Sequence, residues 1–358
     1  MSLAIATKKY RHMLDQPPPA PLPPETRAGR EWAQLLAKYR EPSSPRAAFE
    51  LCVTVGPFLA LWGLAWWALS LSYVLSVVLA LCAAPFLLRL FAIQHDCGHG
   101  AFFKSRSMND WLGRALGVVT LTPYDVWRHS HSIHHSSSGN LGRRGIGDIN
   151  TLTVAEYAAL TPFQRLKYRL YRNPLVLFGL GPGYIFLLEN RLPLGFMGKA
   201  RYWVSAMATN AVLVAVLGLV AWFGGLMPIL LIFLPSTVLA ATAGVWLFYV
   251  QHQFETTHWE AEENWQLHDA ALEGSSHYVL PGWLQWLSAN IGIHHVHHVN
   301  SRIPFYRLPE ALRDHAQLAQ INRMTIRESL ANARLHLWDE KARRLLSFAE
   351  ARAVIEAA

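Results

Sequence analysis

The sequence predicts an all-α integral membrane fold, on the evidence of long uncharged stretches, the placement of basic residues, and histidine clusters beside those stretches. Of 358 residues, 52% are hydrophobic and only 16% are charged, whereas a soluble domain carries about 25% charged residues. Residues 51–88 contain no Asp, Glu, Lys or Arg, and neither do residues 202–254. Each stretch is too long for one span of about 20 residues and fits two. We therefore expect two transmembrane hairpins with interfacial helices and a helical cap.

The break points within these stretches set the four expected spans. The first stretch divides near Ser70–Tyr73 and the second near Gly224–Pro228, where polar, Gly and Pro residues favour turns. The predicted transmembrane helices cover about 50–70, 73–93, 203–223 and 229–250.

Basic residues predict how these spans are oriented. None of the 32 Lys and Arg residues lies in either short connection between paired spans. By the positive-inside rule, both termini, the central loop and the cap are expected in the cytoplasm. The net charge of +8 is explained by this topology, so no nucleic-acid partner is expected.

A third apolar stretch, 174–188, is short and is interrupted by Gly179, Gly181, Pro182 and Gly183. If it crossed the membrane, the last histidine cluster would face the opposite side from the first two. We therefore expect it to be interfacial or half-inserted. The expected organisation is a cytoplasmic N-terminal tether (1–48), a membrane domain (49–310) and a cytoplasmic helical segment (311–358).

Three short clusters hold ten of the 17 histidines, and their spacing predicts a metal centre. His95 and His99 are four residues apart, and the second and third clusters each place histidines at i, i+3 and i+4. On a helix such residues share a face. The eight histidines selected in this way are His95, His99, His131, His134, His135, His294, His297 and His298. Eight ligands are too many for one zinc ion, which takes four, and they suit two iron ions, although imidazole also binds copper, zinc and nickel.

A ninth candidate ligand is His252, which follows the fourth span and emerges at the same depth as the clusters. His129 and His295 fall off the shared faces, so we expect them to support the site or to be solvated. We expect His258, His268 and His277 on the surface or in supporting positions, and His12, His315 and His336 in solvent.

Polar residues beside the clusters are candidates for orienting the ligands, because metal-bound imidazoles commonly donate their second N–H to an acceptor. Asp96, Glu255 and Asn290 are the candidates, and we expect Asp148 and Asn150 in the same polar layer. Trp246, Phe248 and Tyr249, at the end of the fourth span, line either a substrate channel or a membrane-interface belt.

The three clusters resemble the histidine boxes of integral-membrane fatty acid desaturases. Their surroundings are similar to bacterial acyl-lipid desaturases of the omega-6 (Δ12) type. The similar segments are 139–148, 171–179, 249–255 and 290–298. The resemblance covers roughly residues 50–310.

This resemblance implies two iron ions, molecular oxygen, and two electrons from an external ferredoxin or cytochrome b5. It implies a cis double bond in a long, lipid-linked acyl chain, a location in the bacterial inner membrane, and His252 as the additional ligand. In the bacterial pattern, tyrosines are usual where this chain has His258 and His277, and His129 is an extra residue before the second box.

Two alternatives remain at this point. The first is another membrane di-iron oxygenase, such as a hydroxylase or a carotenoid hydroxylase or ketolase, because desaturation and hydroxylation diverge only after the first hydrogen abstraction. The second is a zinc or copper transporter or sensor. Against a transporter, we expect no ionisable residue inside the spans, where a transport path usually places one.

Overall fold

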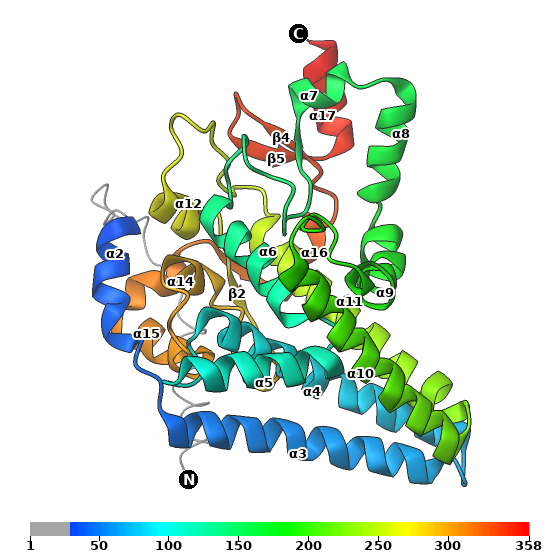
Figure 1. Ribbon diagram of the computed structural model, residues 1–358. Coiled ribbons are helices and arrows are strands. Elements are labelled where there is room, and N and C mark those ends of the chain that lie inside the picture. The colour runs from blue at the N-terminus through cyan, green and yellow to red at the C-terminus, as the bar shows by residue number, and fades with distance from the viewer. Residues whose placement is uncertain (1–28, 358) are drawn as a thin grey trace.

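The computed structural model describes residues 29–357 and is mostly helical (Figure 1). The expectations for His12 and for most of the N-terminal tether lie outside these residues. The helices, with short 3-10 and π segments labelled η, are α2 (Gly29–Leu35), η1 (Leu36–Tyr39), α3 (Ser44–Ala68), α4 (Tyr73–His99), α5 (Arg106–Val119), α6 (Tyr124–Ser137), α7 (Val154–Ala159), α8 (Pro162–Tyr171), η2 (Val176–Leu180), α9 (Gly181–Leu187), η3 (Glu189–Arg191), α10 (Ala200–Gly224), η4 (Ile229–Phe233), α11 (Leu234–His252), α12 (Leu267–Glu273), α13 (Gly282–Leu287), α14 (His294–Val299), η5 (Phe305–Arg307), α15 (Leu308–Asp314), η6 (Ala316–Gln320), α16 (Ile326–Asn332) and α17 (Phe348–Glu356).

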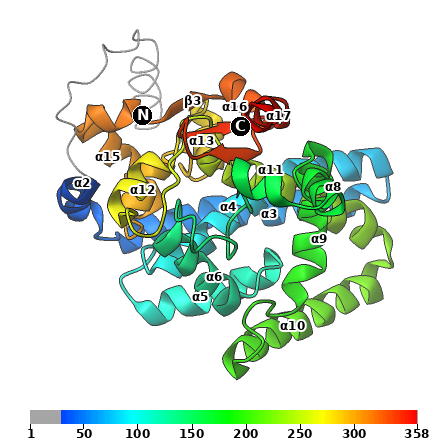
Figure 2. The ribbon, with the colours of Figure 1, turned by 90° about the horizontal axis from the view of Figure 1, so that it is seen from above.

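Four helices within residues 29–357 are long and apolar enough to cross a membrane, and they match the four expected spans: α3, α4, α10 and the continuous η4–α11. Two hairpins, α3–α4 and α10–α11, follow from this order; α3 and α11 both pack against α4, whereas α10 contacts η4 near the turn between them and diverges from α11 in Figure 2. Serine side chains accept hydrogen bonds from the first turns of α3 and α4, which satisfies otherwise unpaired N–H groups. Two ends depart from expectation: α3 begins at Ser44 rather than about residue 50, and α4 continues past residue 93 and carries His95 and His99 on its last turns.

Two ionisable residues, Glu50 and Arg89, lie inside the predicted spans, contrary to expectation. Arg89 of α4 is buried and pairs with the buried Glu50 of α3, and its Nε donates to Thr54 Oγ1 at 3.0 Å. Its guanidinium also lies over the Trp286 ring, 4.2 Å from the centroid. A charge in this setting is tolerated because it is paired and hydrogen-bonded. The sequence argument missed them because Glu50 directly precedes the uncharged stretch and Arg89 directly follows it.

The stretch 174–188 forms the π-helical segment η2 followed by the short helix α9, and both pack against α11. It is not among the candidate spans of the described chain. Arg191 of the following η3 donates from Nη1 to Asn210 Oδ1 of α10 at 3.0 Å. The stretch is thereby attached to both helices of the second hairpin.

The C-terminal segment was expected to be helical, but it also contains strands. The five strands are β1 (Leu152–Thr153), β2 (His277–Val279), β3 (Arg323–Thr325), β4 (Leu337–Asp339) and β5 (Arg344–Leu346). β4 pairs in parallel with β1 and antiparallel with β5, and β2 pairs in parallel with β3. These strands are two or three residues long, too short for the alternation that identifies a strand in sequence.

The extramembrane elements gather at one end of the hairpins, as the two perpendicular views show (Figures 1 and 2). The ends of α4 and α11 carry His99 and His252 toward α6 and α14, which carry the other two clusters. Gly100 ends α4 in a left-handed conformation, with φ of 66°, which glycine adopts at little cost. The chain can therefore turn away directly after His99.

Candidate metal centre

All nine histidines proposed from the sequence come together, in two adjacent groups. The five-histidine group contains His95, His99, His131, His135 and His297, and the four-histidine group contains His134, His252, His294 and His298. Within each group the ligand nitrogens lie within 4.8 Å of one another. The division into five and four was not predicted, because the shared-face argument places the nitrogens near one point without assigning them to separate ions.

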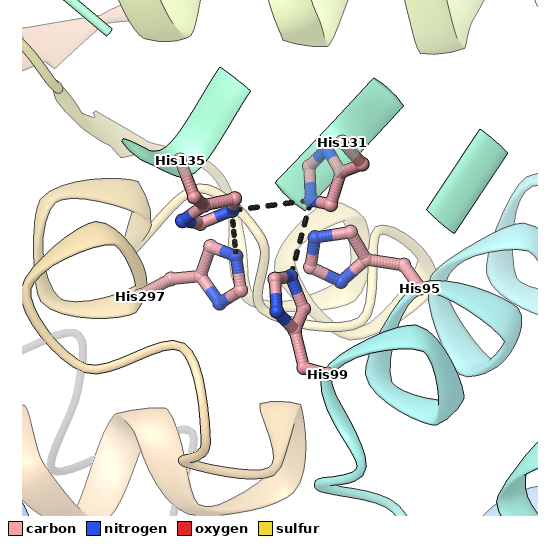
Figure 3. A group of neighbouring side chains, drawn as sticks. All are labelled: His95, His99, His131, His135 and His297. Atoms are coloured by element: carbon pink, nitrogen blue, oxygen red, sulfur yellow. Dashed lines mark hydrogen bonds between the residues drawn. The ribbon is translucent and has the colours of Figure 1, made fainter. Parts of the chain in front are cut away.

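In the five-histidine group the rings converge from α4, α6 and α14 (Figure 3). His131 Nε2 lies 3.1 Å from His99 Nε2 and 3.1 Å from His135 Nε2. His135 Nε2 is also 3.2 Å from His297 Nε2. Since His131 and His135 are one turn apart on α6, one helix face supplies two neighbouring nitrogens.

In the four-histidine group, His252 occupies the central position. Its Nε2 lies 3.2 Å from His134 Nε2 and 3.0 Å from His294 Nε2. Both nitrogens of the fourth member, His298, are buried without a hydrogen-bond partner among the described residues. A buried polar atom without a partner is costly. A metal ion bound by a nitrogen of His298 would remove part of this cost.

The nitrogen contacts fit metal ions better than they fit hydrogen bonding between rings. A neutral imidazole nitrogen carries either one N–H or one lone pair, yet Nε2 of His131, His135 and His252 each faces two other nitrogens. Ligand nitrogens about 2.1 Å from a metal ion lie roughly 3.0–3.4 Å from one another. The observed spacings of 3.0–3.2 Å fall in that range.

Burial keeps these rings in the state that binds metal. The pKa values of the ligand candidates outside the membrane-spanning helices are held well below the ordinary value, mainly by burial and further by neighbouring imidazoles: His131, His135, His294, His297 and His298. At neutral pH these rings are uncharged, and the neutral imidazole is the form that coordinates metal.

Two acceptors orient rings of the four-histidine group. Asp148 Oδ1 pairs with His134 Nδ1, and the carbonyl oxygen of Gly274 lies 3.0 Å from His252 Nδ1. Either contact directs the opposite nitrogen, Nε2, toward the group. Asp148 reaches His134 from a turn in which Gly147 has φ of 74°, a conformation that L side chains rarely adopt. The suggestion of a polar layer therefore holds for Asp148, whereas the Gly274 carbonyl has no side-chain signal in the sequence.

Of the other residues proposed to orient ligand rings, Asp96 faces one, and the rest bond elsewhere. Asp96 Oδ1 is 3.4 Å from His95 Nδ1, and its Oδ2 accepts the backbone N–H of Phe305 at 2.7 Å. Asn290 donates to the Phe305 carbonyl at 3.2 Å and so stabilises the same loop from the other side. The expectation for Glu255 is wrong: its exposed carboxylate pairs with Arg344 at 2.9 Å. For Asn150, it is the backbone N–H that bonds, to Tyr171 Oη.

Three histidines outside the two groups are buried: His295 and His277, which were expected to support the site or to lie in solvent or on the surface, and His336, which was expected to be solvated. His295 Nε2 and His277 Nδ1 each lie 2.8 Å from a backbone carbonyl, those of Leu318 and Ala319. His336 is 9% exposed and stacks on Phe348. The remaining four described histidines are half-buried. His129 stacks on Tyr202, His258 pairs with Glu273 at 2.9 Å, and His315 contacts the Trp32 ring. The fourth is His268.

An apolar cavity of about 270 Å³ begins at the histidines and extends along the membrane-spanning helices. His95, His131 and His294 line it near the metal centre, and Thr237 and Leu87 line it within the spans. Lining positions on α11 run from Gln251 to Thr237, roughly 20 Å of helix. The channel expectation holds for Phe248, which lines the cavity, whereas Tyr249 is buried and donates to the Asn332 carbonyl. Trp246 packs against Phe178.

Comparison with known proteins identifies the family of the chain that carries this arrangement. A family model described as fatty acid desaturase matches residues 68–329. The chain belongs to the fatty acid desaturase family. It is 44% identical over 320 residues to a Bacillus subtilis fatty acid desaturase, covering 89% of this chain and 90% of that one.

Two Synechocystis desaturases are more distant relatives. An sn-1 acyl-lipid omega-3 desaturase (ferredoxin) is 30% identical, with 62% of each chain covered. An sn-1 oleoyl-lipid 12-desaturase is 25% identical, with 79% of this chain and 75% of that one covered. This desaturase is therefore an oxidoreductase with acyl-lipid desaturases among its relatives.

Proposed function

We propose that this desaturase inserts a cis double bond of the Δ12 (omega-6) type into a long acyl chain of a membrane lipid. The proposed co-reactants are molecular oxygen and two electrons from a ferredoxin or cytochrome b5. The observation that supports this proposal most strongly is the apolar cavity that leads from the membrane spans to the two histidine groups. The relative that acts on oleoyl lipids supports the Δ12 assignment.

The nine histidines are proposed to hold two iron ions, one in each group. When bound, iron supplies the oxidising chemistry for breaking two unactivated C–H bonds. The chain positions the acyl group beside the metal centre and excludes water from it. Small residues of α11, Ala240, Ala241 and Gly244, line the cavity and leave space for a hydrocarbon chain beside α4. Phe248 and Trp127 flank it near the histidines and keep water from the reacting carbons.

The orienting contacts keep the ligand rings fixed during turnover. With Asp148 bonded to His134 Nδ1 and the Gly274 carbonyl beside His252 Nδ1, each ring presents Nε2 without reorganisation, which preserves the geometry of the centre. We also propose that the histidine end of the molecule faces the cytoplasm of a bacterial inner membrane. The absence of Lys and Arg from both short connections supports this orientation.

The test is lipid analysis by gas chromatography–mass spectrometry of cells that express the chain and contain monounsaturated lipids. We expect a new cis diene whose second bond lies at position 12, and no diene with the His297→Ala variant at matched membrane expression. A double bond at another position would reject the Δ12 assignment. Hydroxylated acids without dienes would reject desaturation itself.

A further inference from the structure

A polar pocket of about 480 Å³ lies beside the five-histidine group and shares Trp127 and His131 with the lining of the apolar cavity. We call it the basic pocket. It is bounded by the ends of α4 and α10 and by α5 and α6, which contact one another and lie together in Figure 2. The residues that matter here are Arg106, Arg128, Arg201, His99, His131 and Trp127.

Positive charge predominates around the basic pocket. Of its three guanidiniums, Arg128 pairs with Asp110 at 2.9 Å and Arg106 lies 3.9 Å from the same carboxylate. Arg201 lies over the Tyr202 ring at 4.6 Å and has no carboxylate partner among residues 29–357. The acidic residue lining the pocket, Asp125, is already engaged by Arg114 at 3.1 Å.

The floor of the basic pocket is formed by metal-site residues. His99 and His131 line it and are only half-buried, whereas all members of the four-histidine group are buried. A partner seated on the pocket would therefore lie directly against rings of the five-histidine group. Electron transfer weakens steeply with distance, so this is the favourable entry point.

A wall separates the basic pocket from the apolar cavity. Trp127 and His131 line both spaces, and their rings stack at 4.7 Å with an interplanar angle of 14°. A Cβ at Gly98 would lie 2.9 Å from Trp127 Cζ3, so this contact also fills the space behind the indole. An acyl chain in the cavity cannot have its headgroup in the basic pocket without passing through this wall, which disfavours a lipid occupant.

We propose that the basic pocket is the docking surface for a small acidic electron carrier of the ferredoxin type, with Arg106, Arg128 and Arg201 contacting its carboxylates. This inference rests on the proposed function. Two successive dockings deliver two electrons. The two C–H bonds that break in the acyl chain provide two more electrons and two protons, and solvent provides two further protons. The four electrons and four protons reduce one dioxygen molecule to two waters as the C=C bond forms.

The test compares two reductants on the iron-loaded enzyme: reduced plant-type ferredoxin, and dithionite, which needs no docking surface. We expect Arg106→Glu/Arg201→Glu to raise the KM for ferredoxin about tenfold or more, because opposite-charge contacts become repulsive. Dithionite-driven turnover should fall far less. In the unaltered enzyme the KM for ferredoxin should rise with ionic strength, since salt screens exposed charges.

The matched control is Arg327→Glu/Arg352→Glu, which reverses two exposed charges on α16 and α17 and should leave both activities unchanged. If the test variant loses iron, the neutral Arg106→Gln/Arg201→Gln pair replaces it, with a smaller expected rise in KM. Equal losses with both reductants would assign the pocket to the lipid substrate and overturn the proposal. An unchanged KM for ferredoxin would overturn it as well. If neither reductant supports double-bond formation in the unaltered enzyme or in any variant, the result would instead count against the proposed function.

Discussion

Histidines are buried in two regions of this desaturase, and they meet different partners there. At the metal centre, His134, His294 and His297 are 1–2% exposed, and they lie among other imidazoles. Near the C-terminal segment, His277 and His295 are equally buried, but each has one nitrogen 2.8 Å from a backbone carbonyl. Burial alone therefore does not distinguish a ligand candidate from a structural histidine. What distinguishes the candidates is that several imidazole nitrogens face one point.

The largest effect is expected from removing a ligand candidate from either group. His297→Ala in the five-histidine group, or His134→Ala in the four-histidine group, should abolish turnover while the protein still inserts into the membrane. The reason is that the remaining nitrogens no longer complete a coordination set. Double-bond formation and membrane content are the measurements, and retained turnover would remove the substituted residue from the ligand set.

A sharper comparison pairs two adjacent histidines. His294 faces His252 Nε2 at 3.0 Å, whereas its neighbour His295 contacts the Leu318 carbonyl. His294→Ala should lose the iron of the four-histidine group. His295→Asn should keep both irons and cost about 1–3 kcal/mol of stability for the lost buried bond. Iron per chain and thermal unfolding distinguish them, and iron loss in His295→Asn would break the comparison.

The proposed ninth ligand is tested in the same way. His252→Ala should lose the iron of the four-histidine group and lower turnover severely, because its Nε2 lies between those of His134 and His294. Iron analysis of the purified variant is the measurement. Full iron content with full activity would exclude His252 from the ligand set.

An intermediate effect is expected at the orienting carboxylate. Asp148→Asn keeps an oxygen beside His134 Nδ1 but removes its charge, and such changes typically cost about 10–100-fold in metal affinity or activity. Asp96→Asn should cost less, since Asp96 lies 3.4 Å from His95 Nδ1. Chelator competition measures both. An Asp96 effect larger than that of Asp148 would contradict this ranking.

The smallest effect concerns pH and the C-terminal region. Burial, reinforced by Arg172, lowers the pKa of His336 to about 4, from about 6.5 in an unfolded chain. Between these values the unfolded state binds more protons, so His336 should reduce stability as pH falls from about 6.5 toward 4. The thermal midpoint in detergent should therefore drop less between pH 7 and 5 in His336→Gln than in the unaltered enzyme. An equal drop would contradict the buried, neutral state of His336.

The sequence predicted what depends on composition and helical periodicity. The four spans follow from uncharged length, and the histidines within each cluster follow from spacings that place residues on one helix face. His252 was found because its span fixes its depth. The composition argument assumed that charged residues are excluded from the spans. It failed for Arg89 and Glu50, which lie within the spans as an ion pair.

Contacts between distant segments were beyond the sequence. The Gly274 carbonyl beside His252 is backbone, and any residue type could supply it. Glu255 was proposed from its nearness to His252 along the chain, but the α11 helix ends there and its side chain turns toward Arg344. The short strands β4 and β5 are stabilised by pairing with each other rather than by an alternating pattern.

Metal analysis of the purified protein tests the central claim most directly. After expression in iron-replete cells, we expect two iron ions per chain in the unaltered desaturase, and one in a His252→Ala variant that still inserts. Stoichiometric, tightly bound zinc in place of iron would contradict the two-ion centre proposed here. So would an unaltered desaturase that holds only one iron and whose iron content does not change in the His252→Ala variant.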